Sequence, residues 1–169
     1  PAAIVLMSPW LDLELSAAWM SETDQSDPVH ERRRLRDAAR RWVDKAYTFE
    51  HRRAAVAAGG FNRDTYNALA ELGLTALNVA EERGGMGMGA VEAMVVMEEM
   101  GRGMVLEPLS QSLITAKVLG QYAPEAVQAD WLPRIASGEA LVVLAHQERR
   151  ARYRLDKCES KATQTPDGY

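Results

Sequence analysis

The chain contains 169 residues, a length that suits one domain or one domain with part of a second. Hydrophobic residues make up 47% of the chain and charged residues 26%, as in ordinary globular proteins. A net charge of −4 gives no support to a nucleic-acid partner. No apolar run approaches the roughly 18–20 residues of a membrane span, so we expect no membrane insertion. The single cysteine, Cys158, excludes an internal disulfide and favours a reducing compartment, which predicts a cytoplasmic protein.

Residues 1–28 differ in composition from the rest of the chain. They contain no Lys or Arg, whereas six arginines follow between residues 32 and 41. The opening Pro-Ala-Ala-Ile-Val-Leu-Met-Ser-Pro-Trp-Leu predicts a short strand over residues 2–7. It also resembles a strand-and-loop segment of the α/β-hydrolases related to hormone-sensitive lipase, without their Gly-x-Ser-x-Gly nucleophile motif. The segment is therefore either a fusion remnant or an ordinary N-terminal extension.

The first predicted helix covers residues 28–47. Asp27-Pro28 is a favourable start, with Asp as the N-cap and Pro at the first helical position. Apolar side chains then recur at helical spacing: Leu35, Ala39, Trp42, Val43 and Ala46. The arginines occupy the other face. A solvated face is favoured over a nucleic-acid contact because acidic residues are interleaved with them: Glu31, Asp37 and Asp44.

Four further helices are predicted up to residue 138. The second begins after the cap residue Asn62 and ends at Gly73. Its expected inward side chains are Tyr66, Leu69 and Leu72. The third lies between Gly89 and Gly103, and its expected inward stripe is Val91, Met94, Val95 and Glu98. Pro108 opens the fourth, which runs to about residue 122. Pro124 opens the fifth, which ends at residues 137–138, with Pro133 in its last turn.

Two strands are predicted after the helices, over residues 141–146 and 162–165, with a turn at residues 166–168. A hairpin that ends at its turn leaves unpaired edges, so we expect the natural protein to continue. The predicted fold is mainly α, with about five helices followed by a truncated β-domain start. The predicted divisions are an extension over 1–28, a helical domain over 29–138 and the beginning of a β-domain over 139–169.

A glycine-rich loop joins the second and third helices. Gly85, Gly87 and Ala90 fit G-x-G-x-x-A, and Glu107 lies near the distance of a ribose-binding acid, as in dinucleotide sites. That fingerprint requires a strand directly before its first glycine. A mobile loop between helices is the alternative.

Two motifs in this part of the chain resemble acyl-CoA dehydrogenases. Residues 76–87, Ala-Leu-Asn-Val-Ala-Glu-Glu-Arg-Gly-Gly-Met-Gly, are similar to the family pattern G-L-x-x-x-x-x-P-E-E-x-G-G-x-G, with Ala80 in place of the usual proline. Residues 98–103, Glu-Glu-Met-Gly-Arg-Gly, resemble the E-E-x-G-R-G end of the next family helix. The resemblance covers residues 29–169. It implies the N-terminal helical domain of a flavoenzyme, with residues 76–87 near the acyl-binding cavity.

The same resemblance implies a flavin site after residue 143. Family members carry Y-A-x-T-E-P-x-A-G-S where this chain has residues 144–153, so Leu144, Gln147 and Tyr153 are the candidate FAD-binding residues. Glu148 and Ala151 agree with the pattern, but arginines replace its proline and glycine. This departure resembles a divergent branch that includes small subunits of pimeloyl-CoA dehydrogenase-type enzymes. The arginines either bind a cofactor phosphate or form a solvated loop; they are Arg149, Arg150, Arg152 and Arg154.

The resemblance implies FAD-dependent α,β-dehydrogenation of an acyl-CoA in fatty acid metabolism, within a homo- or hetero-oligomer. In most of the family a carboxylate base in a C-terminal helical domain removes the α proton, so this chain is assigned no catalytic residue and is expected to be inactive alone. Glu81-Glu82 and Glu98-Glu99 are predicted to lie at the surface. The three histidines are scattered, so no metal site is predicted. The alternatives are a non-catalytic helical interaction module or a non-flavin subunit of a mixed oligomer.

Overall fold

The computed structural model describes residues 28–145, 148–151, 154, 156, 159–161 and 163. These residues contain six α-helices: α2 (Pro28–Ala46), α3 (Phe49–Ala57), α4 (Arg63–Glu71), α5 (Ala90–Gly103), α6 (Leu109–Tyr122) and α7 (Glu125–Ala136). Two short 3₁₀ helices lie between α4 and α5, η1 (Leu74–Ala76) and η2 (Glu81–Arg83). The prediction of a mainly α fold is confirmed. The strand expected over residues 2–7 lies outside the described residues.

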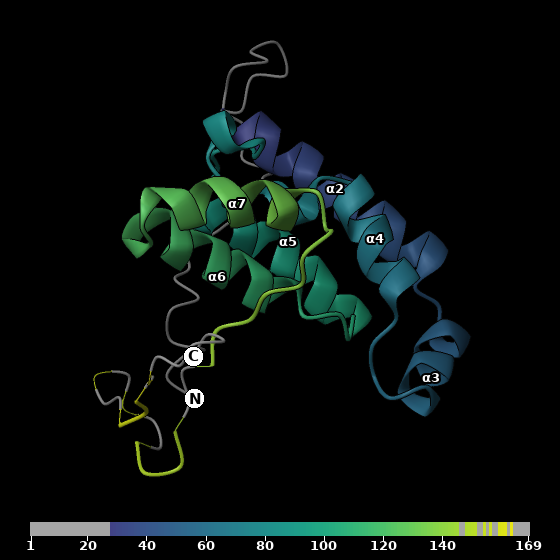
Figure 1. Cartoon of the computed structure of the whole chain (residues 1–169). Coiled ribbons are helices and arrows are strands. Elements are labelled where there is room, and N and C mark those ends of the chain that lie inside the picture. Colours follow the sequence, from purple (N-terminus) through teal and green to yellow (C-terminus); the bar gives the residue numbers. More distant parts are fainter. Residues whose placement is uncertain are drawn as a thin grey trace.

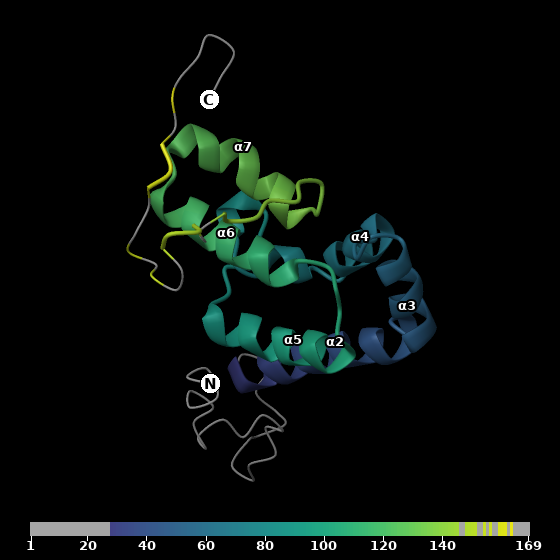
Figure 2. The same ribbon diagram turned by 90° about the horizontal axis from the view of Figure 1, so that it is seen from below.

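The helices form two packed pairs, joined at one end by α3 and α4 (Figures 1 and 2). Helix α2 lies along α5, and α6 lies along α7. The segment that contains η1 packs against α4, α6 and α7, so it lies between the two pairs. This arrangement places α5 and α6 side by side, each with its own partner helix behind it.

Two clusters of buried apolar side chains fill the interior. The first joins α2, α4, α5 and the start of α6, and contains Ala39, Val43, Leu69, Leu74, Leu77, Val96, Met100, Leu109 and Leu113. The second joins α6, α7 and the end of the η1 segment, and contains Ala76, Val79, Ala116, Leu132, Ile135, Ala136 and Ala140. Neutral hydrogen bonds cross this interior, between Tyr66 Oη and Ser112 Oγ (2.8 Å) and from Thr75 Oγ1 to the Ala136 carbonyl (2.8 Å).

Several helix ends lie where the sequence places them. The Asn62 side chain accepts a hydrogen bond from the Thr65 amide (3.0 Å), which satisfies a backbone donor that α4 cannot satisfy itself. Gly73 follows α4 with φ of 77°, a left-handed conformation that favours glycine. Helices α6 and α7 follow Pro108 and Pro124 directly, as expected.

Helix α3 is absent from the sequence prediction. Thr48 caps it by accepting a hydrogen bond from the His51 amide (3.2 Å), and Ala55 is its one buried residue. A helix that buries a single side chain has no apolar stripe, so its periodicity gives little signal. The described residues therefore contain six α-helices rather than five.

The predicted buried face of α5 is wrong at three of its four residues and right at Val95. Val91 and Met94 are about 40% exposed and Glu98 is also exposed, whereas Val95, Val96, Glu99, Met100 and Gly103 are buried. The predicted stripe included Glu98 and left out Glu99, whereas the structure exposes Glu98 and buries Glu99. Helix α5 turns Glu99 inward because two arginines neutralise it. Leu72, expected to be inward, is 37% exposed because it lies at the C-cap of α4.

The strand predicted over residues 141–146 is also wrong in its described part. Residues 141–145 adopt no regular secondary structure. Their exposure alternates, with Leu141 and Val143 exposed and Val142 and Leu144 half-buried. The alternation is that of a strand, but a strand also needs a neighbour for its ladder of hydrogen bonds. No described segment provides one. The strand expected over 162–165 lies almost wholly outside the described residues.

Candidate functional site

The glycine-rich loop is fastened to the segment that precedes it. The amides of Met86 and Met88 donate to the carbonyls of Ala76 (3.0 Å) and Leu77 (2.8 Å), and Gly87 donates to Val79 (2.7 Å). A side chain at Gly85 would collide with the Val79 carbonyl, so glycine is required at this close approach. These bonds are not those of a free loop. They hold residues 86–88, which lead into α5, against residues 76–79.

The dinucleotide interpretation of this loop is wrong. The chain before Gly85 forms 3₁₀ turns, so the strand that the fingerprint needs is missing from this described segment. Glu107, the candidate ribose-binding acid, lies in the α5–α6 connection and is 4% exposed. Neither of its carboxylate oxygens has a hydrogen-bond partner among the described residues.

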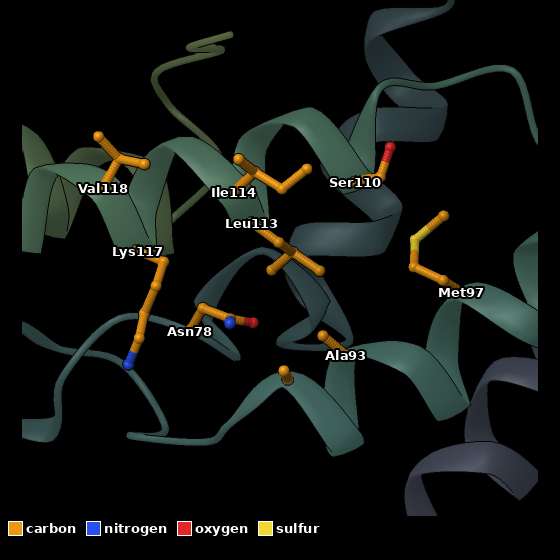
Figure 3. A pocket seen from close by; sticks show the side chains of 9 residues that line it. Asn78, Ala93, Met97, Ser110, Leu113, Ile114, Lys117 and Val118 are labelled. Carbon is orange, nitrogen blue, oxygen red and sulfur yellow. The ribbon is translucent and has the colours of Figure 1, made fainter. Parts of the chain in front are cut away.

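A groove with a volume of about 350 Å³ opens between α5 and α6 (Figure 3). Its accessible surface is almost wholly apolar. The lining residues come from three segments that the fold brings together. They are Asn78 from the η1–η2 connection, Ala90, Ala93 and Met97 from α5, and Ser110, Leu113, Ile114, Lys117 and Val118 from α6. We call this feature the α5–α6 groove.

The polar side chains of the α5–α6 groove contribute little to its surface. The Oδ1 atom of Asn78 is shielded from solvent and has no hydrogen-bond partner in the described part of the chain. Lys117 is exposed and stands at one end of the groove, whereas Met97 stands at the other (Figure 3). Leu113 lies between them and also belongs to the first apolar cluster, which anchors this wall of the groove in the core.

Ion pairs hold α5 against α2, behind the groove. The Glu99 carboxylate is 1% exposed and accepts hydrogen bonds from Arg40 (2.6 and 3.0 Å) and from Arg102 Nε (2.7 Å). Burial by itself raises the pKa of Glu99. The hydrogen bonds from the two arginines, with the attraction of their charges, outweigh burial and hold that pKa below its usual value.

A second pair fixes the start of α5. The Glu92 carboxylate accepts hydrogen bonds from Arg32 Nε (2.8 Å) and from the Gly89 amide (2.9 Å). Burial raises the pKa of Glu92. The two hydrogen bonds and the Arg32 charge lower that pKa by more than burial raises it, so the net shift is downward, as for Glu99. Two arginines of α2, Arg32 and Arg40, therefore pair with carboxylates of α5. The face of α2 that was expected to be solvated is in part an interface with α5.

The candidate flavin residues are not brought into the α5–α6 groove in the described structure. Leu144 is half-buried and is absent from the groove lining. Gln147 and Tyr153 lie outside the described residues, so their role stays a prediction. The Glu148 carboxylate accepts hydrogen bonds from the amides of Glu159 (2.7 Å) and Ser160 (2.8 Å). The arginines described nearby are exposed: Arg149, Arg150 and Arg154.

A family model describes most of the helical region. Residues 30–139 match the model of the acyl-CoA dehydrogenase N-terminal domain. This match extends over more than half of the chain, and the helical fold agrees with it. The chain therefore belongs to the acyl-CoA dehydrogenase family.

Individual relatives place the chain within that family. It is 33% identical over 141 residues to (2S)-methylsuccinyl-CoA dehydrogenase of Cereibacter sphaeroides, an alignment that covers 79% of this chain and 25% of the relative. It is 32% identical over 130 residues to acyl-CoA dehydrogenase FadE12 of Mycobacterium tuberculosis, covering 70% and 31% of the two chains. The chain thus spans about a quarter to a third of the length of these curated relatives.

A solved structure supports the same assignment. A variant of the Tcur3481-Tcur3483 steroid ACAD superposes with a TM-score of 0.67 and 26% identity, over 71% of this chain and 33% of that one. The hydrolase resemblance of residues 1–28 is unsupported by these comparisons. Within the described residues, no helix is long and apolar enough to cross a bilayer. The same residues hold no cluster of three potential metal ligands.

Proposed function

We propose that this chain is the helical part of a flavin-dependent acyl-CoA dehydrogenase, and that the α5–α6 groove receives the acyl group of the thioester. The groove carries this proposal. It is an apolar recess of about 350 Å³ in a chain of this family, next to the segment that the resemblance links to acyl binding. Such a recess stabilises a hydrocarbon by removing its surface from water.

The groove-lining side chains would bind and orient the acyl group and exclude water from it. They include no carboxylate or histidine, and their one amine, Lys117, is exposed at one end of the groove, so we assign the base to none of them. FAD, when bound in the whole protein, would supply the hydride acceptor for the β carbon. We assign the base to a part of the protein beyond the matched helical region, and we assign no catalytic residue to this chain.

The described residues around Leu144 do not form a flavin site by themselves. Val143 and Ala145 are exposed, and the Glu148 carboxylate is occupied by two backbone amides. FAD is therefore proposed for the complete protein only. A cytoplasmic location and assembly into an oligomer belong to the same proposal.

The test compares this chain with the complete protein that contains it. We expect the 169-residue chain to be colourless and inactive when it is incubated with FAD and a panel of acyl-CoA thioesters. The complete protein should show flavin absorbance and should reduce an electron acceptor with at least one thioester. Saturable turnover by the chain alone would contradict the proposal that it is only the helical part of a larger enzyme. If the complete protein shows neither flavin absorbance nor turnover, the proposal that it is a flavin-dependent dehydrogenase is wrong.

A non-flavin subunit of a mixed oligomer is the second candidate. It is favoured by the departures from the flavin pattern at Gln147, Arg149, Arg152 and Tyr153. The complete protein, co-expressed with candidate partner subunits, would then carry less than one FAD per chain. If it does bind FAD, Gln147→Ala should weaken FAD binding by about one hydrogen bond, roughly 0.5–1.5 kcal/mol. One FAD per chain in a homo-oligomer would exclude this candidate.

A further inference from the structure

The two walls of the α5–α6 groove are made from side chains of very different size. Ala90 and Ala93 lie three residues apart on α5, so they share one face of the helix. Branched side chains of α6 supply much of the other wall: Leu113, Ile114 and Val118. The space between the helices is therefore open because α5 carries only methyl groups there. Met97 bounds the end of the groove nearest the C-terminus of α5 (Figure 3).

We propose that the α5–α6 groove selects branched or ring-containing hydrocarbon acyl groups and disfavours acyl groups with a terminal carboxylate, and that Ala93 sets its width. This inference rests on the proposed function, because it specifies the acyl group that the same groove takes.

The exclusion of a carboxylate follows from the chemistry of the lining. A carboxylate that enters an apolar groove loses its hydration and needs donors in return. The buried polar atom of Asn78 is an oxygen, which is an acceptor. The one cationic group in the lining, Lys117, is exposed at one end, where water already solvates it. The interior of the groove therefore offers no cation. Its neutral donors are limited to the Asn78 amide nitrogen and the Ser110 hydroxyl, which compensate a buried charge less well than a paired cation does.

The preference for bulk follows from the width. Dispersion attraction depends on close contact, and a void beside a ligand loses that contact. A linear chain lying against the branched wall of α6 leaves the space above Ala90 and Ala93 unfilled. A branched or cyclic group contacts both walls at once. The flexible thioether of Met97 adjusts to the end of such a group.

The experiment measures binding of matched CoA thioesters to the full 169-residue chain by calorimetry. The probes are cyclohexanecarbonyl-CoA, hexanoyl-CoA and adipoyl-CoA, with free CoA as the baseline. Methyl NMR of Ala93 and Met97 locates the acyl group. We expect the cyclic thioester to bind most tightly and the dicarboxylic one at least roughly tenfold more weakly.

Ala93→Leu fills the width of the groove and should reduce binding of the cyclic thioester by roughly tenfold or more, with little change for hexanoyl-CoA. Ala126→Leu, at an exposed position of α7 outside the groove lining, is the matched control and should change neither. Circular dichroism confirms that both variants fold.

The outcomes separate the two levels of the proposal. If adipoyl-CoA binds as tightly as cyclohexanecarbonyl-CoA, or more tightly, the proposed selectivity is overturned, but the groove remains the acyl site. Weaker adipoyl-CoA binding in Lys117→Ala would then show that Lys117 holds the carboxylate. An Ala93→Leu variant that binds the cyclic thioester normally overturns the role of Ala93. If no thioester binds more tightly than CoA, or if the Ala93 and Met97 methyl signals do not move, the groove is not the acyl site and this part of the proposed function fails as well.

Discussion

Both helix pairs beside the groove pack apolar side chains, but among the described residues only the α2–α5 interface also carries ion pairs. Between α2 and α5, charged side chains bridge the helices, and one carboxylate is nearly fully buried among them. Between α6 and α7, apolar side chains meet, and neutral hydrogen bonds join Ser112 of α6 to Tyr66 of α4 and Thr75 of η1 to the Ala136 carbonyl of α7. The α5–α6 groove therefore has one wall whose position depends partly on ion pairs and one wall whose position depends on apolar packing and neutral hydrogen bonds.

The difference predicts different responses to the solvent. Ion pairs with partly exposed arginines are weakened by salt and by protonation of the carboxylate. Apolar packing is weakened by neither. We therefore expect the α5 wall to loosen first as the pH falls, while the α6 wall keeps its place. The predictions below test this comparison, beginning with the largest expected effect.

Truncation of a fully buried leucine should be the most damaging change. Leu69 is 0% exposed in the first apolar cluster and Leu132 is 2% exposed in the second. Leu69→Ala and Leu132→Ala should each lower the free energy of unfolding by about 2–5 kcal/mol, through lost burial and a cavity. Urea denaturation in low and high salt measures this, and both losses should be independent of salt. Costs below about 0.5 kcal/mol at both positions would mean that the core is wrongly placed.

Removal of the buried charge on α5 should come next. Glu99→Gln keeps the shape of the side chain, but its amide oxygen can accept from only one of Arg40 and Arg102, because the amide nitrogen in the other position is a donor. We expect a loss of about 1.5–3 kcal/mol in low salt that becomes smaller in high salt. Glu98→Gln, at the exposed neighbouring position, is the control and should stay within about 0.5 kcal/mol. A loss at Glu99 that salt does not change would contradict the ionic origin.

The same carboxylate should give the fold a dependence on pH. The folded-state pKa values of Glu92 and Glu99 lie below their usual value, so both groups bind protons more readily in the unfolded chain. Their contribution to stability is complete above the unfolded-state pKa, about 4.3, and is lost as the pH falls through the lower folded-state values. Thermal unfolding between pH 7 and pH 3 should therefore show a steeper loss for the native chain than for Glu99→Gln. Parallel curves for the two proteins would contradict this linkage.

Helix positions follow largely from the sequence because their signals are local. Asn62, Gly73 and the prolines before α6 and α7 act through their own backbone or through neighbours within three residues. Helix α3 was missed because it buries only Ala55 and so carries no stripe. Trp42, expected in the core, is half-buried against the first apolar cluster, and Ala46 is exposed near the end of α2.

The candidate site depends on contacts between distant segments. Glu99 is buried because Arg40, 59 residues earlier, lies against it, and no local pattern reports such a partner. The groove likewise combines Asn78, Met97 and Leu113 from three separate elements. The family motif located the first of these elements. The width of the groove, and the faces that α5 and α6 turn toward it, could be seen only in the packed structure. The strand expected at residues 141–145 failed for a related reason, since a strand is defined by its neighbour.

The smallest expected effect concerns Glu107, which is buried like Glu99 but lacks its partners. Glu107 is 4% exposed in the α5–α6 connection. Neither carboxylate oxygen has a hydrogen bond of normal geometry from the described residues, although the Tyr47 hydroxyl lies close enough to interact with it. A buried carboxylate without donors costs free energy, and the amide of Gln has the same shape without the charge. Glu107→Gln should therefore leave the free energy of unfolding unchanged or raise it by up to about 1 kcal/mol.

Chemical denaturation at pH 7 of Glu107→Gln and Glu99→Gln, side by side, measures the contrast. The two substitutions remove the same charge from equally buried positions, so any difference between them reports the hydrogen-bond partners of the carboxylate. Two arginines donate to Glu99, whereas Glu107 has no hydrogen bond of normal geometry from the described residues. A loss at Glu107 as large as the loss at Glu99 would show that the Glu107 carboxylate also has a strong donor. In that case charge would also contribute to holding the connection between α5 and α6.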